Sequence, residues 1–387
     1  MCHWRRSRRD PGRIRQWIPH RVLRMSTEEA DAPPPDPEHA ATVPPTLAKA
    51  KGLLERRGSN NSLTIQVQQS TEDTETIRSA GMECPEVQFL TSAGNRLSRR
   101  QLRETEWNSS ALRAEFWDIP LNFPDRCPMP GTGANNRYNT VIPNEHSRVL
   151  LPARPEDPLS TYINANWIKG YDGEERAYIA TQGPLAHTLG DFWRMVLHHR
   201  APAVVMITKL REDERIKCAG YLPETRQTSC FGGVQVTVQC ARPRSGYTVR
   251  QVLLQCGEER LELRHFWFTA WPDHQAPDHS RQLLQMAAEV ETARRSQQRR
   301  PPGPVVVHCS AGIGRTGCFI ATSIGACQLQ QENSVDVLGI VCGLRQDRGG
   351  MVQTAEQYIF LHKALRDFEA TLPPIGSADK RMMSSMR

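Results

Sequence analysis

The sequence contains no apolar run that approaches the length of a membrane-spanning helix, although 38% of its 387 residues are hydrophobic. The basic N-terminal stretch has the charge of the first part of a signal peptide, but no continuous apolar segment follows it. A chain of this length and composition is able to bury a sizeable core. We therefore expect a globular, cytoplasmic protein that does not associate with a membrane.

Paired cysteines are also missing. The eleven cysteines are scattered, odd in number and form no Cys-x2-Cys motif, so the spacing indicates no disulfide framework. No cluster of histidine, cysteine and carboxylate residues has the spacing of metal ligands. We expect reduced thiols, no metal and no cofactor.

Beyond its first residues the chain has no excess of charge. Residues 1–24 contain eight arginines and a single acid, which together account for the whole net charge of +7. The rest of the chain is neutral overall, so nothing in it requires an acidic polymer as a partner. This distribution argues against binding to nucleic acid.

Composition divides the chain into five segments, and no internal repeat is found. The first segment is too rich in charge and proline to bury enough apolar surface against the entropy of ordering. The expected segments are 1–45, a disordered basic and then Pro-rich region; 51–67, a short motif; 68–110, a linker; 111–370, one globular domain; and 371–387, a flexible tail.

Helical and strand periodicities are mixed within the globular domain, which predicts an α/β fold with a mixed sheet and helices on its faces. Helical spacing is found at 112–119, 189–197, 283–290, 317–330, 335–346 and 355–369, and strand patterns at 202–207, 234–238, 249–254 and 261–271.

The most informative stretch is 305–317, Val-Val-Val-His-Cys-Ser-Ala-Gly-Ile-Gly-Arg-Thr-Gly. A β-branched run leads into a glycine-rich turn, and a helix is predicted to follow. In this order, the N–H groups of the loop and the positive end of the helix point at one spot, which forms a nest for an anion such as phosphate. The loop lacks the Gly-Lys-Ser/Thr ending of a nucleotide-binding loop.

Cys309 and Arg315 give this nest its chemistry. The amides and the guanidinium favour the thiolate form of Cys309, which makes it a candidate nucleophile. Arg315 is able to bind two phosphate oxygens at once. Cys-x5-Arg alone leaves open the alternative of a buried cysteine at a strand end. The catalytic interpretation is favoured by His308, Thr316 and the glycines at 312, 314 and 317.

The stretch closely resembles the signature loop of the protein tyrosine phosphatases. The resemblance implies a single phosphatase domain with a twisted mixed sheet flanked by helices, and catalysis through a phosphocysteine at Cys309. It also implies that Thr316 hydrogen-bonds the departing thiolate and that His308 supports the loop. The phosphate-binding residues that it implies are Cys309, Ser310, Ala311, Gly312, Ile313, Gly314 and Arg315.

Other segments resemble motifs of the same family, in the expected order. Trp271-Pro272-Asp273 resembles a mobile loop whose aspartate, here Asp273, protonates the leaving oxygen and later activates water. Taken alone, this tripeptide favours an ordinary turn at the end of a strand. Asn136-Arg137-Tyr138 resembles the substrate loop, in which Tyr138 stacks on phosphotyrosine. Gln353 is implied to orient the attacking water, with Gln357 beside it.

Glu212 and Lys217 match a loop that braces the signature arginine and the acid loop, although a solvated charged turn is an alternative. Trp167 and Leu222 replace a tyrosine and the tryptophan of a Tyr-Trp-Pro motif, which we interpret as exchanges in the core. Thr140 replaces an aspartate that anchors the substrate backbone in many relatives. This last change argues against tight, sequence-specific peptide binding and suggests that targeting is done elsewhere.

The segment 51–67 carries a second motif. Arg56 and Arg57, a short spacer, and then Leu63 and Ile65 form the pattern of a peptide that docks on mitogen-activated protein kinases. A disordered basic patch is the alternative. Together with the phosphatase-like domain, the motif resembles the kinase-interaction-motif group of the family. Ser59 follows the arginine pair as in the sites of protein kinase A-like kinases.

In that group a Thr-Pro phosphorylation site follows the docking segment. Cys84-Pro85 stands in its place, so we expect this site to be lost. The leading hypothesis is a monomeric tyrosine phosphatase that docks to mitogen-activated protein kinases and acts on them. A non-catalytic scaffold that sequesters the kinases is one alternative, against which the intact catalytic residues argue. A dual-specificity or lipid phosphatase is another, although such shallower sites lack the substrate-loop tyrosine.

Overall fold

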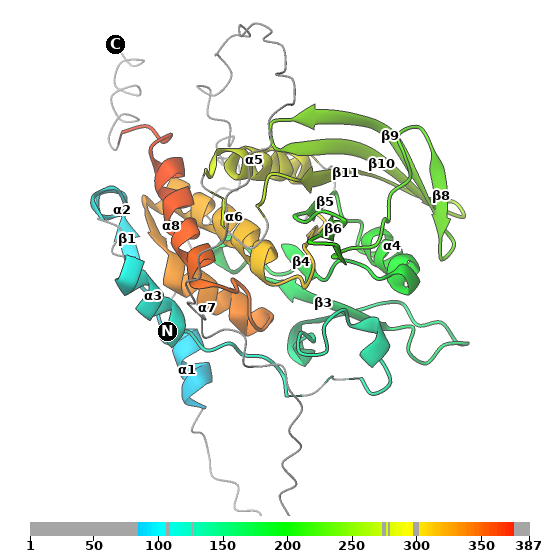
Figure 1. Ribbon diagram of the computed structural model, residues 1–387, viewed down its shortest axis with the longest axis horizontal. Helices are drawn as coiled ribbons and strands as arrows, with labels where there is room; N and C mark the ends of the chain where they lie inside the picture. The colour runs from blue at the N-terminus through cyan, green and yellow to red at the C-terminus, as the bar shows by residue number, and fades with distance from the viewer. Residues whose placement is uncertain are drawn as a thin grey trace, which may run out of the picture. The chain divides into compact units, whose positions relative to one another are not determined.

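The computed structural model describes residues 84–105, 109–125, 127, 129–272, 276–277, 279–296 and 302–374. Their largest element is a mixed nine-stranded sheet with the order β2-β3-β4-β12-β5-β11-β10-β9-β8 (Figure 1). The strands from β4 to β11 in this order run parallel, and antiparallel pairs extend the sheet on both sides. The strands are β2 (Arg148–Leu150), β3 (Tyr162–Ile168), β4 (Tyr178–Thr181), β5 (Ala203–Met206), β8 (Thr228–Phe231), β9 (Val234–Arg244), β10 (Tyr247–Cys256), β11 (Glu259–Phe268) and β12 (Val305–His308).

Helices cover both faces of this sheet. On one face α5, α6, α7 and α8 share a hydrophobic core with the strands, and on the other face α4 packs against the apolar sides of β9, β10 and β11. Figure 1 shows the four helices gathered on one side of the sheet and α4 on the other. The helices are α4 (Leu189–His198), α5 (Arg281–Arg295), α6 (Gly314–Glu332), α7 (Val337–Asp347) and α8 (Ala355–Glu369).

The central strand β12 explains the β-branched run in the sequence. Val305 and Val307 point into the core beneath α5–α8, whereas Val306 points into the core beneath α4. Because side chains alternate along a strand, a strand covered on both faces is apolar throughout. The carboxyl ends of β12 and of its parallel neighbours β4 and β5 meet at one edge, where ligand sites form in such sheets.

The predicted fold class, an α/β domain with a twisted mixed sheet and flanking helices, is confirmed. The strand patterns at 234–238, 249–254 and 261–271 correspond to the long strands β9, β10 and β11. The smaller elements between residues 130 and 220 are the hairpin of β6 (Arg211–Glu212) and β7 (Arg215–Ile216), and the 3-10 turns η1 (Gly133–Asn135), η2 (Glu145–Ser147), η3 (Tyr171–Gly173) and η4 (Ala186–Thr188).

The folded unit begins earlier than residue 111, so the prediction of a linker over 68–110 is wrong for its second half. Three elements precede α3 (Ser109–Asp118), namely α1 (Pro85–Ser92), β1 (Arg96–Ser98) and α2 (Arg99–Glu104). The strand β1 pairs with β13 (Ser334–Asp336) in a small separate sheet.

Apolar contacts and ion pairs hold this N-terminal segment in place. Leu90 and Leu102 are buried in the core, and Arg99 Nε donates to Glu369 Oε1 over 2.7 Å in a buried ion pair. Most of its hydrogen-bond and ion-pair partners outside the segment lie more than 200 positions away in the sequence. No local periodicity could therefore indicate that it packs.

The predictions for residues 1–45, 51–67, 68–83 and the tail from residue 375 concern segments that lie outside the described residues, and they stay predictions. No helix in the described part combines the length and the apolar character needed to cross a membrane.

We predict that Leu102→Ala lowers the free energy of unfolding by about 2–5 kcal/mol, because Leu102 of α2 is fully buried. Arg100→Ala is the matched control, since the Arg100 side chain is 80% exposed on the same helix, and we expect it to change stability by less than about 1 kcal/mol. Urea unfolding measures both effects. Equal stability of the two variants would show that α2 does not contribute to the fold.

Candidate active site

The candidate site forms where β12 ends. Cys309 directly follows the strand and is 5% exposed, and the loop after it turns into the first residue of α6. Gly312 has a φ of +74°, and a Cβ at this position would lie 2.1 Å from the carbonyl oxygen of Thr181 on β4. Only glycine satisfies both constraints, so the close approach of β4 fixes the path of the loop.

Arg348, just after α7, holds the loop from behind. Its Nε donates to Gly312 O over 2.9 Å, and its Nη2 donates to Ala311 O over 3.1 Å. In a trans peptide the C=O and the following N–H point in opposite directions. The N–H groups of Gly312 and Ile313 therefore face away from Arg348, as an anion nest requires.

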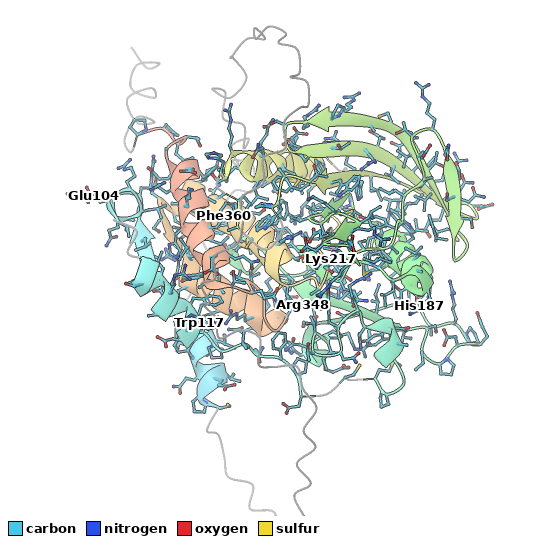
Figure 2. All side chains as sticks on the ribbon, in the orientation of Figure 1. Glu104, Trp117, His187, Lys217, Arg348 and Phe360 are labelled. Atoms are coloured by element: carbon cyan, nitrogen blue, oxygen red, sulfur yellow. The ribbon has the colours of Figure 1, made fainter. Side chains whose placement is uncertain are left out.

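The same guanidinium is anchored to β3, where it donates to Asn164 Oδ1 and Asn166 Oδ1 over 2.7 Å each. Arg348 is completely buried, and burial lowers its pKa to about 10, so it remains charged at neutral pH. Figure 2 shows Arg348 in the middle of the molecule, with Trp117 of α3 and Glu104 of α2 at its edge. Sequence reasoning missed Arg348, because nothing local connects it to the loop that it supports.

Arg315, in the first turn of α6, is fixed by Glu212 of β6. Its Nη1 and Nη2 donate to Glu212 Oε1 and Oε2 over 2.5 and 3.0 Å, in a bidentate pair. Glu212 is buried and also accepts from Thr208 Oγ1 and from the backbone N–H of Lys209. Burial by itself raises the pKa of Glu212, but the hydrogen bonds and charge of Arg315 outweigh it and lower this pKa. A solvated turn is thereby excluded for Glu212.

Most of the predicted site residues line one cavity of about 770 Å³. Cys309 and the first turn of α6 lie at its base, and Thr140 and the side chain of Trp271 also line it. Asp273 lies outside the described residues. The predicted residues that line the cavity are Tyr138, Glu212, Lys217, Cys309, Ser310, Ala311, Gly314, Arg315, Gln353 and Gln357.

The wall that carries Tyr138 is tied to the end of β4 by its neighbour Arg137. Arg137 Nε and Nη2 donate to the carbonyl oxygens of Gly183 and Pro184 over 2.9 and 2.8 Å. Tyr138 itself is 38% exposed, and its hydroxyl lies 2.9 Å from Ser310 Oγ, which in turn donates to Lys217 O. The tyrosine ring is thus held at the entrance of the cavity.

The glutamines lie over the start of α6. A Cβ added to Gly314 would come within 3.0 Å of Gln357 Nε2 and 3.1 Å of Gln353 Oε1. The Gln353 N–H donates to Gln357 Oε1 over 2.8 Å. Val352, just before them, has a φ of +58°, a strained conformation for a β-branched residue. Such strain is found where the surrounding structure fixes the geometry of a functional site.

Two predicted residues lie beneath the cavity instead of in its wall. Thr316 is fully buried, and its hydroxyl has no hydrogen-bond partner among the described residues. His308 is fully buried too, and burial lowers its pKa to about 4. Its Nδ1 lies 3.1 Å from Cys309 O, which can only accept, so Nδ1 carries the proton.

The neutral His308 begins a chain of hydrogen bonds. Its Nε2 must accept from the Tyr221 hydroxyl, 2.7 Å away, because Nδ1 already carries the proton. The Tyr221 oxygen in turn accepts from Nε2–H of His265 over 2.6 Å. In this series of hydrogen bonds His265 Nδ1 carries no proton and can only accept. It has no hydrogen-bond partner among the described residues. Tyr221 and His265 were not identified from the sequence.

The site therefore combines a buried thiol, inward-facing backbone amides and a fixed guanidinium, a set that suits a tetrahedral oxyanion. In the described residues, no group of three or more His, Cys, Asp or Glu side chains is placed to hold a metal ion. A sequence model described as protein-tyrosine phosphatase matches residues 133–367. The chain belongs to the protein-tyrosine phosphatase family.

Relatives within this phosphatase family are similar over most of the chain. Receptor-type tyrosine-protein phosphatase R of Mus musculus is 50% identical over 335 residues, which cover 85% of this chain and 50% of the relative. Tyrosine-protein phosphatase non-receptor type 5 of Rattus norvegicus is 48% identical over 330 residues, 84% of this chain and 88% of the relative. Non-receptor type 7 of Mus musculus is 47% identical over 337 residues, 86% of this chain and 92% of the relative. The chain thus spans about half the length of the receptor-type relative.

We predict that Glu212→Gln destabilises the protein at neutral pH by about 1–3 kcal/mol, because the partly buried Arg315 loses a charged partner. The folded pKa of Glu212 lies below its ordinary value of 4.5. Its contribution to stability is therefore fully present above about pH 4.5 and is lost as the pH falls through the folded pKa. Glu214→Gln, an exposed carboxylate of the same loop, is the control.

Urea unfolding at pH 7 and at pH 3.5 measures this difference. The gap between Glu212→Gln and the natural sequence should narrow at the lower pH, whereas Glu214→Gln should match the natural sequence at both. A gap that widens at pH 3.5 would contradict the assigned pKa direction.

Proposed function

We propose that this chain is an active protein tyrosine phosphatase that hydrolyses phosphotyrosine through a phosphocysteine intermediate. The observation that carries the proposal is the placement of Cys309 beside the guanidinium of Arg315, which Glu212 fixes by two hydrogen bonds. A dianionic phosphate bound there meets the loop amides on one side and the guanidinium on the other. Both stabilise the charge of the transition state.

In the first step the thiolate of Cys309 attacks phosphorus, and the bond to the tyrosine oxygen breaks. Asp273, acting as an acid, gives its proton to that oxygen. Asp273 lies outside the described residues, and its role is supported by the position of Trp271 in the cavity wall.

In the second step water attacks the phosphocysteine and gives a proton to Asp273, while the Cys309 thiolate leaves. Gln353, with Gln357 beside it, orients this water over the start of α6. The Thr316 hydroxyl, unpartnered within the described residues, donates a hydrogen bond to the departing thiolate. The step regenerates both catalytic groups, so no cofactor is needed.

Tyr138 gives the site its preference for phosphotyrosine. Tyr138 is 38% exposed and lines the same cavity as Cys309, which is 5% exposed, and we propose that a phosphoserine side chain is too short to pass the tyrosine and reach the thiol. This favours a tyrosine phosphatase over a dual-specificity or lipid phosphatase. Thr140, which also lines the cavity, supplies no carboxylate to anchor a substrate backbone.

We further propose that the chain belongs to the kinase-interaction-motif group and is similar in its docking segment to the haematopoietic protein tyrosine phosphatase. Substrate choice then depends on the segment 51–67, whose Arg56, Arg57, Leu63 and Ile65 dock on a mitogen-activated protein kinase. The kinase is both partner and substrate, and the phosphatase acts as a monomer in the cytoplasm. Two of the relatives described above carry non-receptor names, which supports this location.

Replacing the nucleophile tests the proposed chemistry. We predict that Cys309→Ser abolishes turnover of p-nitrophenyl phosphate while phosphopeptide binding persists, because the nest and Arg315 remain. Cys230→Ser, at an exposed cysteine on β8, is the control and should keep full activity. Steady-state kinetics and calorimetric titration measure the two quantities.

Retained turnover in Cys309→Ser would exclude this mechanism. Equal inactivity of the natural sequence and of Cys309→Ser, with kinase binding intact, would instead identify a non-catalytic scaffold.

Phosphorylation of Ser59 should weaken kinase docking. The phosphate adds a charge of about −1.5 to −2 next to Arg56 and Arg57, which are proposed to meet an acidic groove. Calorimetric titration of the kinase with peptide 51–67, with and without phosphate on Ser59, measures the effect. Identical affinities would rule out the switch, and a lack of binding by both peptides would rule out docking by this segment.

A further inference from the structure

A second cavity, of about 510 Å³, is lined by Tyr221, whose hydroxyl is hydrogen-bonded to His308. It shares no lining residue with the cavity that contains Cys309, and its volume is within the range of small-molecule sites. Met206, Leu222 and Trp267 give it an apolar wall, and the exposed residues Glu224 and Thr225 lie at its rim. Tyr221 and His265, which continue the hydrogen-bond chain from His308, line it as well.

The cavity lies where this sequence departs from the pattern of the family. Leu222 lines it and occupies the position at which the family pattern places the tryptophan of Tyr-Trp-Pro. Leucine is much smaller than an indole and half-buried here. The substitution therefore leaves space beside Trp267 that a tryptophan side chain could fill.

The charge in this cavity is not compensated. Arg250 and His265 are directly paired on β10 and β11, so their side chains share a face of the sheet. The guanidinium of Arg250 lies 4.9 Å from the centre of the Trp267 ring. Its Nη1 is buried without a hydrogen-bond partner, and no carboxylate in the described part lies within ion-pair distance of it.

The other polar groups that line the cavity do not neutralise the charge of Arg250. Glu224, the one carboxylate among the described lining residues, is exposed at the rim and accepts from Gln227 Nε2 over 3.4 Å. His265 is fully buried, and its Nδ1 is the bare acceptor at the end of the chain from His308. A half-buried guanidinium without a carboxylate partner is stabilised by a ligand of opposite charge.

We propose that this cavity binds a small aromatic carboxylate. The carboxylate pairs with the guanidinium of Arg250, which lines the cavity, and the ring packs between Trp267 and the apolar side chains of Met206 and Leu222. The inference does not depend on catalysis, because it concerns residues that do not line the cavity of Cys309.

The test is ¹⁹F NMR titration of 4-fluorobenzoate with the full chain, repeated with saturating orthovanadate, an oxyanion that fits the nest beside Cys309. We expect saturable binding that vanadate does not displace. The neutral analogue 4-fluorobenzamide should bind at least about tenfold more weakly, because it lacks the charge that pairs with Arg250.

Two variants locate the site independently. Leu222→Trp should abolish binding by filling the cavity, and Arg250→Met should weaken it at least about tenfold by removing the cation while keeping an apolar side chain. Thermal unfolding verifies that each variant is folded. Undiminished binding in either folded variant, displacement of the probe by vanadate, or a lack of binding to the natural sequence would overturn the proposal.

Discussion

The geometry of the active site depends on one buried guanidinium. Arg348 donates to the carbonyl oxygens of Ala311 and Gly312 on one side and to Asn164 and Asn166 of β3 on the other. Without these hydrogen bonds the loop carbonyls would be free to turn toward the cavity and the N–H groups away from it. The carbonyl oxygens would then repel a bound anion. All four acceptors are neutral, so the full positive charge of Arg348 also contributes to the potential behind Cys309.

A second cation, Arg315, completes the site under a different constraint. A long side chain at the start of a helix has many rotamers, and a bidentate carboxylate selects one of them. Glu212 does this from a short hairpin about a hundred positions earlier in the sequence. Because Glu212 is itself buried and accepts further hydrogen bonds, its pairing with Arg315 fixes the hairpin and the guanidinium together.

A series of hydrogen bonds through the sheet links the walls of the two cavities. His308, Tyr221 and His265 form a continuous chain of hydrogen bonds from the backbone of Cys309 to the wall of the cavity with Arg250. Each hydroxyl or imidazole has one proton to give, and the Cys309 carbonyl can only accept, so this carbonyl fixes the direction of every hydrogen bond in the chain.

Local sequence alone determined the central unit of this protein. The order of strand, loop and helix, the nucleophile and the arginine all lie within residues 305–317, so their geometry follows from backbone preferences and glycine positions. The alternating valines likewise predicted the antiparallel strands, because one face of each is buried. Tertiary structure decided everything that depends on partners far apart in the sequence. Arg348, the pairing of Glu212, the packing of residues 85–104 and the cavity around Arg250 carry no periodicity, because hydrogen bonds and cavities arise only when distant segments meet.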